Sequence, residues 1–257
     1  MNSSTRRRCR VPRCPWVSVL ADGAVDGAAP ANRTTGDGVG PNPQIGTSIV
    51  PRVRIVSMCG SLGSASANRA ALDIAVDHLR AADHTVVPIE RLTEVPAFQP
   101  QLVDDAGPEV DTLRETLESC DGVLLAVPEY AGGLAGVVKN ALDWLVGSAS
   151  LYHRPFVVLS AGTTGGQFAL EQVIRTLSWQ GALVVNNLSI AAPRTKMDIN
   201  GRFSDPDTIA AIERWASQLI AAVGAAPSER RTLVANVVAP YGIDPARFGE
   251  LPPARVT

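Results

Sequence analysis

The chain has 257 residues, of which 46% are hydrophobic and 19% are charged, a balance typical of a globular protein with enough apolar material for a core. Its formal net charge is −2, which argues against nucleic acid or an anionic membrane as a partner. No apolar run reaches the roughly 20 residues that a membrane span needs.

Residues 1–50 differ in composition from the rest of the chain, because they combine a basic start with many Gly and Pro residues and no apolar periodicity. Such a segment cannot bury enough apolar surface to offset the entropy lost on ordering, so we expect a disordered leader. We expect a folded domain over residues 51–224 and a C-terminal tail over residues 225–257. The tail's one apolar run, Leu233–Val238, either packs against a partner subunit or stays loose.

Short apolar runs and amphipathic segments alternate along the predicted domain. The runs predicted as strands are Val53–Met58, Thr85–Ile89, Gly122–Val127, Phe156–Ser160 and Ala182–Val185. The helices that follow them are predicted over residues 72–79, 108–119, 138–145, 170–177 and 209–220, mostly from apolar residues at helical spacing. This alternation predicts an α/β fold, a doubly wound five-stranded parallel sheet with helices on both faces. Pro88 places its strand near an edge.

Three loops rich in small residues follow predicted strands, at Cys59–Asn68, Pro128–Gly136 and Ser160–Gln167. Open parallel sheets bind ligands at the carboxyl ends of their strands. In the first loop, hydroxyls and free N–H groups before a helix suit a phosphate, but they suit a plain helix cap at Ser64 or Ser66 equally well. The loop has neither the Lys of a P-loop nor a GxGxxG pattern. In the other two loops, small residues allow a flat ring to approach the backbone closely.

The four cysteines are scattered, and neither they nor the three histidines have the spacing of a metal site. We therefore expect no disulfide framework and no bound metal. This cysteine usage fits a reducing, cytoplasmic location.

At these loops the sequence resembles the NADPH-dependent FMN reductases, a flavodoxin-like family that includes quinone, azo-dye and chromate reductases. The family's first loop reads roughly GSxRxxSxN, and Gly60-Ser61, Ser66 and Asn68 match it. Its second loop reads roughly PEYNxSxPxxLKNAxDW, which is matched by Pro128-Glu129-Tyr130, Lys139-Asn140-Ala141 and Asp143-Trp144. The resemblance covers about residues 53–223 and implies a flavodoxin-like fold.

The resemblance also implies a function: bound FMN takes a hydride from NADPH or NADH and passes electrons to a small acceptor such as a quinone or free flavin. The cofactor performs this chemistry, so no catalytic residue is implied. The residues implied to bind FMN are Ser61, Ser66 and Asn68 at the phosphate, and Pro128, Glu129, Tyr130, Ala131, Gly132, Ser160, Thr163 and Gly165 along the ring. Family members commonly form homodimers or homotetramers, and we expect Lys139, Asn140 and Asp143 to anchor their helix.

The sequence also departs from the family pattern at the proposed site. Gly63 stands where the family has an arginine, and Ala131, Gly133 and Ala135 replace Asn, Ser and Pro. We expect either weaker FMN binding or another basic residue that supplies the missing charge. Two alternatives stay open: a flavodoxin-like electron carrier, and a flavin-free regulatory or scaffold module.

Overall fold

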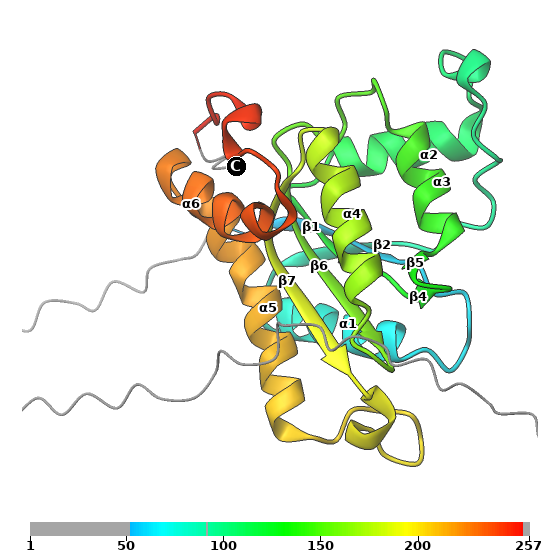
Figure 1. The fold of residues 1–257 in the computed structure, drawn as a ribbon, viewed down its shortest axis with the longest axis vertical. Coiled ribbons are helices and arrows are strands. Elements are labelled where there is room, and N and C mark those ends of the chain that lie inside the picture. The colour runs from blue at the N-terminus through cyan, green and yellow to red at the C-terminus, as the bar shows by residue number, and fades with distance from the viewer. Residues whose placement is uncertain (1–51, 91, 254–257) are drawn as a thin grey trace, which may run out of the picture. The chain divides into compact units, whose positions relative to one another are not determined.

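The computed structural model describes residues 52–90 and 92–253, so the predicted leader over residues 1–50 lies outside the described residues. The central element is a five-stranded parallel sheet in the order β2-β1-β3-β6-β7 (Figure 1). Its strands are β1 (Arg54–Cys59), β2 (Thr85–Ile89), β3 (Gly122–Ala126), β6 (Pro155–Gly162) and β7 (Leu183–Ala191). The chain moves outward from β1 to β2 and then returns to β3 on the other side of β1. The predicted doubly wound α/β fold is therefore confirmed.

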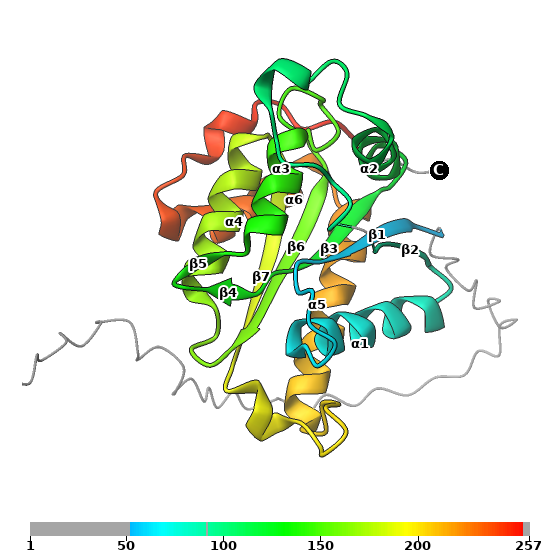
Figure 2. The ribbon, with the colours of Figure 1, turned by 90° about the vertical axis from the view of Figure 1, so that its right-hand side faces the viewer.

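Helices cover both faces of this sheet (Figures 1 and 2). One face carries α1 (Ala67–Ala81) and α5 (Pro206–Gly224), which pack against each other. The other carries α2 (Pro108–Glu118), α3 (Gly136–Trp144) and α4 (Gln167–Trp179), and the 3₁₀ turn η1 (Pro100–Leu102) precedes α2. No helix in the described ranges is long and apolar enough to cross a membrane.

The strands at the centre and at the edge of the sheet differ as their sequences predict. Every residue of β3 is buried, because helices on both faces exclude water from a central parallel strand. Pro88 lies in β2, which is an edge strand, so the N–H that proline lacks is not needed for a second neighbour.

Strand β7 is longer than the predicted strand over residues 182–185. It continues to Ala191 and pairs with β6 along its whole length, with an irregularity between Phe156 and Val157. Asn186, Asn187 and Ser189 are half-buried within it. These polar residues ended the apolar run in the sequence, but pairing with β6 keeps the chain extended.

The segment after α5 folds back onto the same sheet. Its helix α6 (Pro227–Val238) packs against β7, and the 3₁₀ turns η3 (Ala239–Tyr241) and η4 (Pro245–Phe248) follow it. Val234 and Phe248 join the core cluster. The sequence analysis left open whether this tail packs on a partner subunit or stays loose, whereas Val234 and Val238 are buried within their own chain.

Candidate functional site

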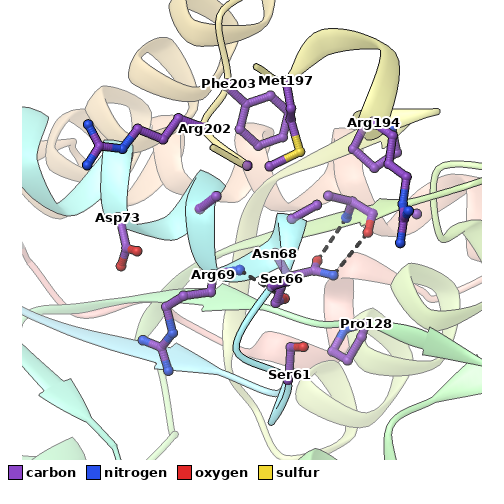
Figure 3. Close-up of a pocket in the computed structure, with 18 of the residues that line it drawn as sticks. Ser61, Ser66, Asn68, Arg69, Asp73, Pro128, Arg194, Met197, Arg202 and Phe203 are labelled. Atoms are coloured by element: carbon purple, nitrogen blue, oxygen red, sulfur yellow. Dashed lines mark hydrogen bonds between the residues drawn. The ribbon is translucent and has the colours of Figure 1, made fainter. Parts of the chain in front are cut away.

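A groove of about 1520 Å³ lies at the carboxyl ends of the parallel strands (Figure 3). The three loops singled out from the sequence contribute to its lining, together with a segment of residues 192–203 that follows β7. Of the predicted site residues, Ser61, Ser66, Asn68, Pro128, Glu129, Tyr130 and Thr163 line the groove. Ala131, Gly132, Ser160 and Gly165 lie in the same loops but outside its lining.

The first loop presents unpaired backbone donors at the start of α1. None of the backbone N–H groups of residues 61–68 forms a hydrogen bond with the described part of the chain. The Ser66 hydroxyl is the N-cap of α1 and accepts from the Arg69 N–H at 3.2 Å. The cap uses a single N–H, so it leaves the other donors of this loop unpaired at a helix end whose dipole favours negative charge. These donors fit a phosphate group.

Gly60 is required by the close packing of this loop. A Cβ at this position would lie 2.1 Å from a methyl carbon of Val138 on α3. The Gly60 N–H also donates to the Ala126 carbonyl at 2.8 Å, which continues the sheet into the loop.

Asn68 is buried, and its carboxamide is bonded to the end of β6. The Asn68 Nδ2 donates to the Ala161 carbonyl at 3.0 Å, and Oδ1 accepts from the Ala161 N–H at 2.8 Å. This two-way bond holds the first turn of α1 against β6, so Asn68 fixes the geometry of the groove.

The second loop is a tight hairpin formed by β4 (Glu129–Tyr130) and β5 (Gly133–Leu134). Its two turn residues, Ala131 and Gly132, have left-handed φ angles of 51° and 71°. Asparagine adopts this conformation more readily than alanine. The family's proline position is Ala135, whose φ of −55° lies in the range of proline. These two departures therefore keep the backbone that the family residues favour.

The Glu129 side chain joins the second loop to the third. Its carboxylate accepts from the N–H groups of Phe168 at 2.8 Å and Ala169 at 3.2 Å, in the first turn of α4. The N-cap position of this helix is Gly166, which has no side chain to cap it. Glu129 supplies that cap from another loop.

The third loop turns back at Gly165 and Gly166, whose φ angles are 87° and 69°. Ser160 is buried beneath this turn, where a Cβ on Gly166 would lie 1.9 Å from its hydroxyl oxygen. The Ser189 hydroxyl donates to the Gly165 carbonyl at 2.8 Å. Ser160 thus supports the loop from beneath and Gly165 forms its turn, while Thr163 lines the groove.

The C-terminal part of the second motif acts away from the groove. Asn140 accepts from the Phe98 N–H at 2.8 Å and donates to the Pro96 carbonyl at 2.9 Å. The Trp144 indole N–H donates to the same carbonyl at 2.7 Å, and Lys139 pairs with Asp143 at 2.6 Å. Asn140 and Trp144 therefore fasten the loop before α2 to α3.

The segment after β7 forms a wall of the groove that the sequence reasoning missed. Its η2 turn (Pro193–Lys196) starts at Ala192, and a bridge between Met197 and Phe203 closes the following loop. Arg194 and Arg202 of this segment line the groove. The segment lies beyond the last predicted strand and has no periodic pattern, so only its basic residues could have drawn attention to it.

The titratable groups in and near the groove are mainly carboxylates, arginines and thiols. No histidine is among the described residues that line it. Cys59, at the end of β1, and Cys120 are free thiols, and burial raises the pKa of both, that of Cys120 to about 11. Burial also raises the pKa of Asp73, which lines the groove.

The strand order β2-β1-β3-β6-β7, with small-residue loops at the carboxyl ends of the strands, defines the flavodoxin-like class of doubly wound α/β proteins. Within that class, the chain belongs to the NADPH-dependent FMN reductase family, whose family model matches residues 53–196. The family uses FMN together with NAD(P)H.

Curated relatives agree with this assignment. An NAD(P)H-dependent FMN reductase of Pseudomonas aeruginosa is 26% identical over 182 residues, covering 65% of this chain and 97% of that protein. A quinone reductase of Escherichia coli is 27% identical over 144 residues, which cover 52% of this chain and 74% of that protein. An NAD(P)H:quinone oxidoreductase of Solanum tuberosum is 30% identical over 134 residues, which cover 48% of this chain and 68% of that protein.

Solved structures support the fold. FerB, a flavoenzyme NAD(P)H:(acceptor) oxidoreductase from Paracoccus denitrificans, matches with a TM-score of 0.57 at 22% identity, over 66% of this chain and 96% of that one. An NADH:FMN oxidoreductase in its apo form matches with a TM-score of 0.51 at 17% identity, over 69% of this chain and 94% of that one.

Proposed function

We propose that this chain is an NAD(P)H-dependent reductase that holds FMN in the groove and passes electrons to a quinone, a free flavin or a similar small acceptor. The observation that carries the proposal is the set of unpaired N–H groups over residues 61–68, at the start of α1. They follow β1, which pairs with β3 where the strand order reverses, the position at which doubly wound sheets bind ligands.

The phosphate of FMN would bind to these N–H groups and to the hydroxyls of Ser61 and Ser66. Asn68 would act by holding the first turn of α1 in place, since its carboxamide is already bonded to Ala161. A helix N-terminus with free donors stabilises an anion without further side chains.

The flavin ring would lie along the second and third loops. The chain there offers Pro128, Glu129, Tyr130 and Thr163 to the groove. Ala131 and Gly132 would contribute through the shape of the hairpin, and Ser160 and Gly165 through the shape of the third loop. Bound FMN would supply the redox chemistry, which is hydride acceptance and electron transfer. These residues therefore need only position its ring and exclude water from one side.

The size of the groove supports a second molecule beside the flavin. Its volume of about 1520 Å³ exceeds the roughly 300–1,000 Å³ of a typical site for one small molecule. The exposed ring of Tyr130 stands at this groove. We propose that NAD(P)H and the acceptor bind here in turn, next to the flavin ring.

We further propose that residues 51–224 carry the FMN site, that the protein forms a homodimer or homotetramer, and that it works in the cytoplasm without nucleic-acid partners. Exposed apolar side chains support an interface near the groove, because neighbouring apolar surface favours association. These side chains are Leu62, Tyr130, Phe168 and Ile199. Light scattering during size-exclusion chromatography measures the mass of the assembly.

The test of the proposed function is steady-state oxidation of NADPH and NADH with FMN and a benzoquinone. We expect oxidation to depend on the protein and on the quinone. Ser61→Asp should abolish it, because a carboxylate in the anion cradle repels the phosphate. Thr164→Asp is the matched control, since Thr164 is exposed and does not line the groove. Oxidation no faster than with free FMN would contradict the proposal.

A further inference from the structure

We propose that Arg194 supplies the positive charge for the FMN phosphate, in place of the arginine that the family carries at the position of Gly63. This inference rests on the proposed function and adds a binding residue from a part of the chain outside the three flavin loops.

The first loop alone does not balance the charge of the ligand. A phosphate monoester carries a charge of about −1.5 to −2 at neutral pH. The N-terminus of α1 offers the equivalent of about half a positive charge. Residues 60–68 contain no basic side chain. A cation from elsewhere in the groove is needed to complete the site.

Of the described residues, three arginines line the groove, and they differ in the charges around them. Arg69 and Arg202 each have a carboxylate nearby, that of Asp73 and of Asp198, which offsets part of their positive field although neither arginine forms an ion pair with it. The Arg194 side chain forms no hydrogen bond or ion pair with any residue that the structure describes. Its charge is therefore available to a ligand.

A continuous series of hydrogen bonds places the backbone of Arg194 close to the start of α1. The Asn68 side chain binds Ala161 in both directions. The next residue, Gly162, accepts from the Ala192 N–H at 3.1 Å. Ala192 has a left-handed φ of 47°, and it is followed by the buried Pro193. Arg194 thus follows Ala192, which is hydrogen-bonded to the end of β6, and Pro193, which is buried.

The directions of the side chains agree with this assignment (Figure 3). Arg194 extends from the segment above the groove down toward the level of Asn68 and Pro128. Arg202 extends to the left in this view, away from Asn68 and Ser66. The two residues therefore provide a matched pair, with equal charge in one segment and different orientation.

The test compares the affinities of FMN and riboflavin, measured by quenching of flavin fluorescence on titration with the full chain. Riboflavin has the same ring but no phosphate. We expect Arg194→Ala to raise the dissociation constant of FMN about tenfold or more, the range expected for a hydrogen bond to a charged group. The riboflavin constant should stay unchanged. Arg202→Ala, the control, should alter neither constant.

A rescue variant separates loss of charge from loss of structure. A Cβ at Gly63 would meet no atom within 4 Å, and its φ is not in the left-handed region. Gly63→Arg should therefore be accommodated, and in the Arg194→Ala background it should restore most of the FMN affinity while leaving riboflavin binding unchanged.

The inference is overturned if Arg194→Ala binds FMN as the wild type does, if it weakens riboflavin equally, or if Arg69→Ala alone produces the selective loss. In each of these cases the wild-type chain still binds FMN and oxidises NADPH, so the proposed function stands. A wild-type chain that binds neither flavin contradicts the proposed function itself.

Discussion

At the scale of single residues, the hairpin turn shows how a departure from the family pattern affects the fold. Ala131 has a left-handed φ of 51°, and Gly132 next to it has a φ of 71°. Residues with a Cβ disfavour this conformation by about 1–2 kcal/mol, whereas glycine does not. No atom lies within 4 Å of a Cβ built on Gly132, so only the backbone conformation matters there.

We predict that Ala131→Gly raises the free energy of unfolding by about 1 kcal/mol, and that Gly132→Ala lowers it by about the same amount. Urea denaturation of both variants measures these changes. Since the turn keeps its shape, the FMN dissociation constant of Ala131→Gly should equal that of the wild type. Changes of the same sign in the two variants would contradict this account of the turn.

Asn68 and Glu129 illustrate what sequence reasoning can and cannot establish about a site. Their positions in the motifs placed them at the groove, and both line it. Their polar atoms, however, bind Ala161 and the first turn of α4. A motif gives the residue type at a position, but the partner of its side chain depends on segments that are distant in the sequence.

At the scale of elements, α4 begins with a cap from another loop. Gly166 provides no side chain, and the Glu129 carboxylate accepts from Phe168 and Ala169 instead. We predict that Glu129→Ala lowers the free energy of unfolding by about 1–2 kcal/mol, the usual effect of losing a helix cap. Glu129→Gln keeps an acceptor and should cost less.

Hydrogen exchange provides the local readout for this cap. The amide protons of Phe168 and Ala169 should exchange faster in Glu129→Ala than in the wild type, whereas those in the middle of α4 should not. Unchanged exchange at both amides would show that the cap does not form in solution.

Helix α5 begins with a cap of its own, at Asp205. Hydrogen bonds from the Thr208 hydroxyl and the Thr208 N–H lower the pKa of Asp205 below its ordinary value of 3.8. Because the pKa of Asp205 is lower in the folded state than in the unfolded state, the ionised carboxylate stabilises the fold at pH values above the ordinary pKa. That stabilisation is lost as the pH falls through the pKa of the folded state.

We therefore predict that the wild type is more stable than Asp205→Asn at pH 7, and that this difference shrinks as the pH falls below the ordinary pKa of an aspartate. Urea denaturation at a series of pH values down to pH 3 measures it. A difference that stays constant with pH would contradict the contribution of the ionised carboxylate.

The elements themselves were predictable to different degrees. Apolar runs predicted β1, β2, β3 and β6 to within about two residues at either end. The second half of β7 was missed because its asparagines and Ser189 interrupt the apolar pattern. The hairpin of β4 and β5 was also missed, since strands of two residues leave no periodicity.

At the scale of the whole described domain, alternation of strands and helices was sufficient to predict the parallel sheet, and the general rule for open parallel sheets indicated the carboxyl ends of the strands as the place of the candidate site. The wall formed by residues 192–203 was not predictable, because it is held by backbone hydrogen bonds to Gly162 and Thr163. Backbone bonds of this kind leave no signature in residue type. The same limit applies to α6, whose packing against β7 depends on the surface that it meets.

The central claim is that the groove holds FMN in a state that NADPH can reduce. The most direct test is the visible absorption spectrum of the full chain after incubation with excess FMN and removal of unbound flavin, recorded without oxygen before and after NADPH is added. We expect flavin absorbance in a one-to-one ratio with the chain, and we expect NADPH to bleach it and a quinone to restore it. A colourless protein, or a bound flavin that NADPH leaves oxidised, would contradict the account.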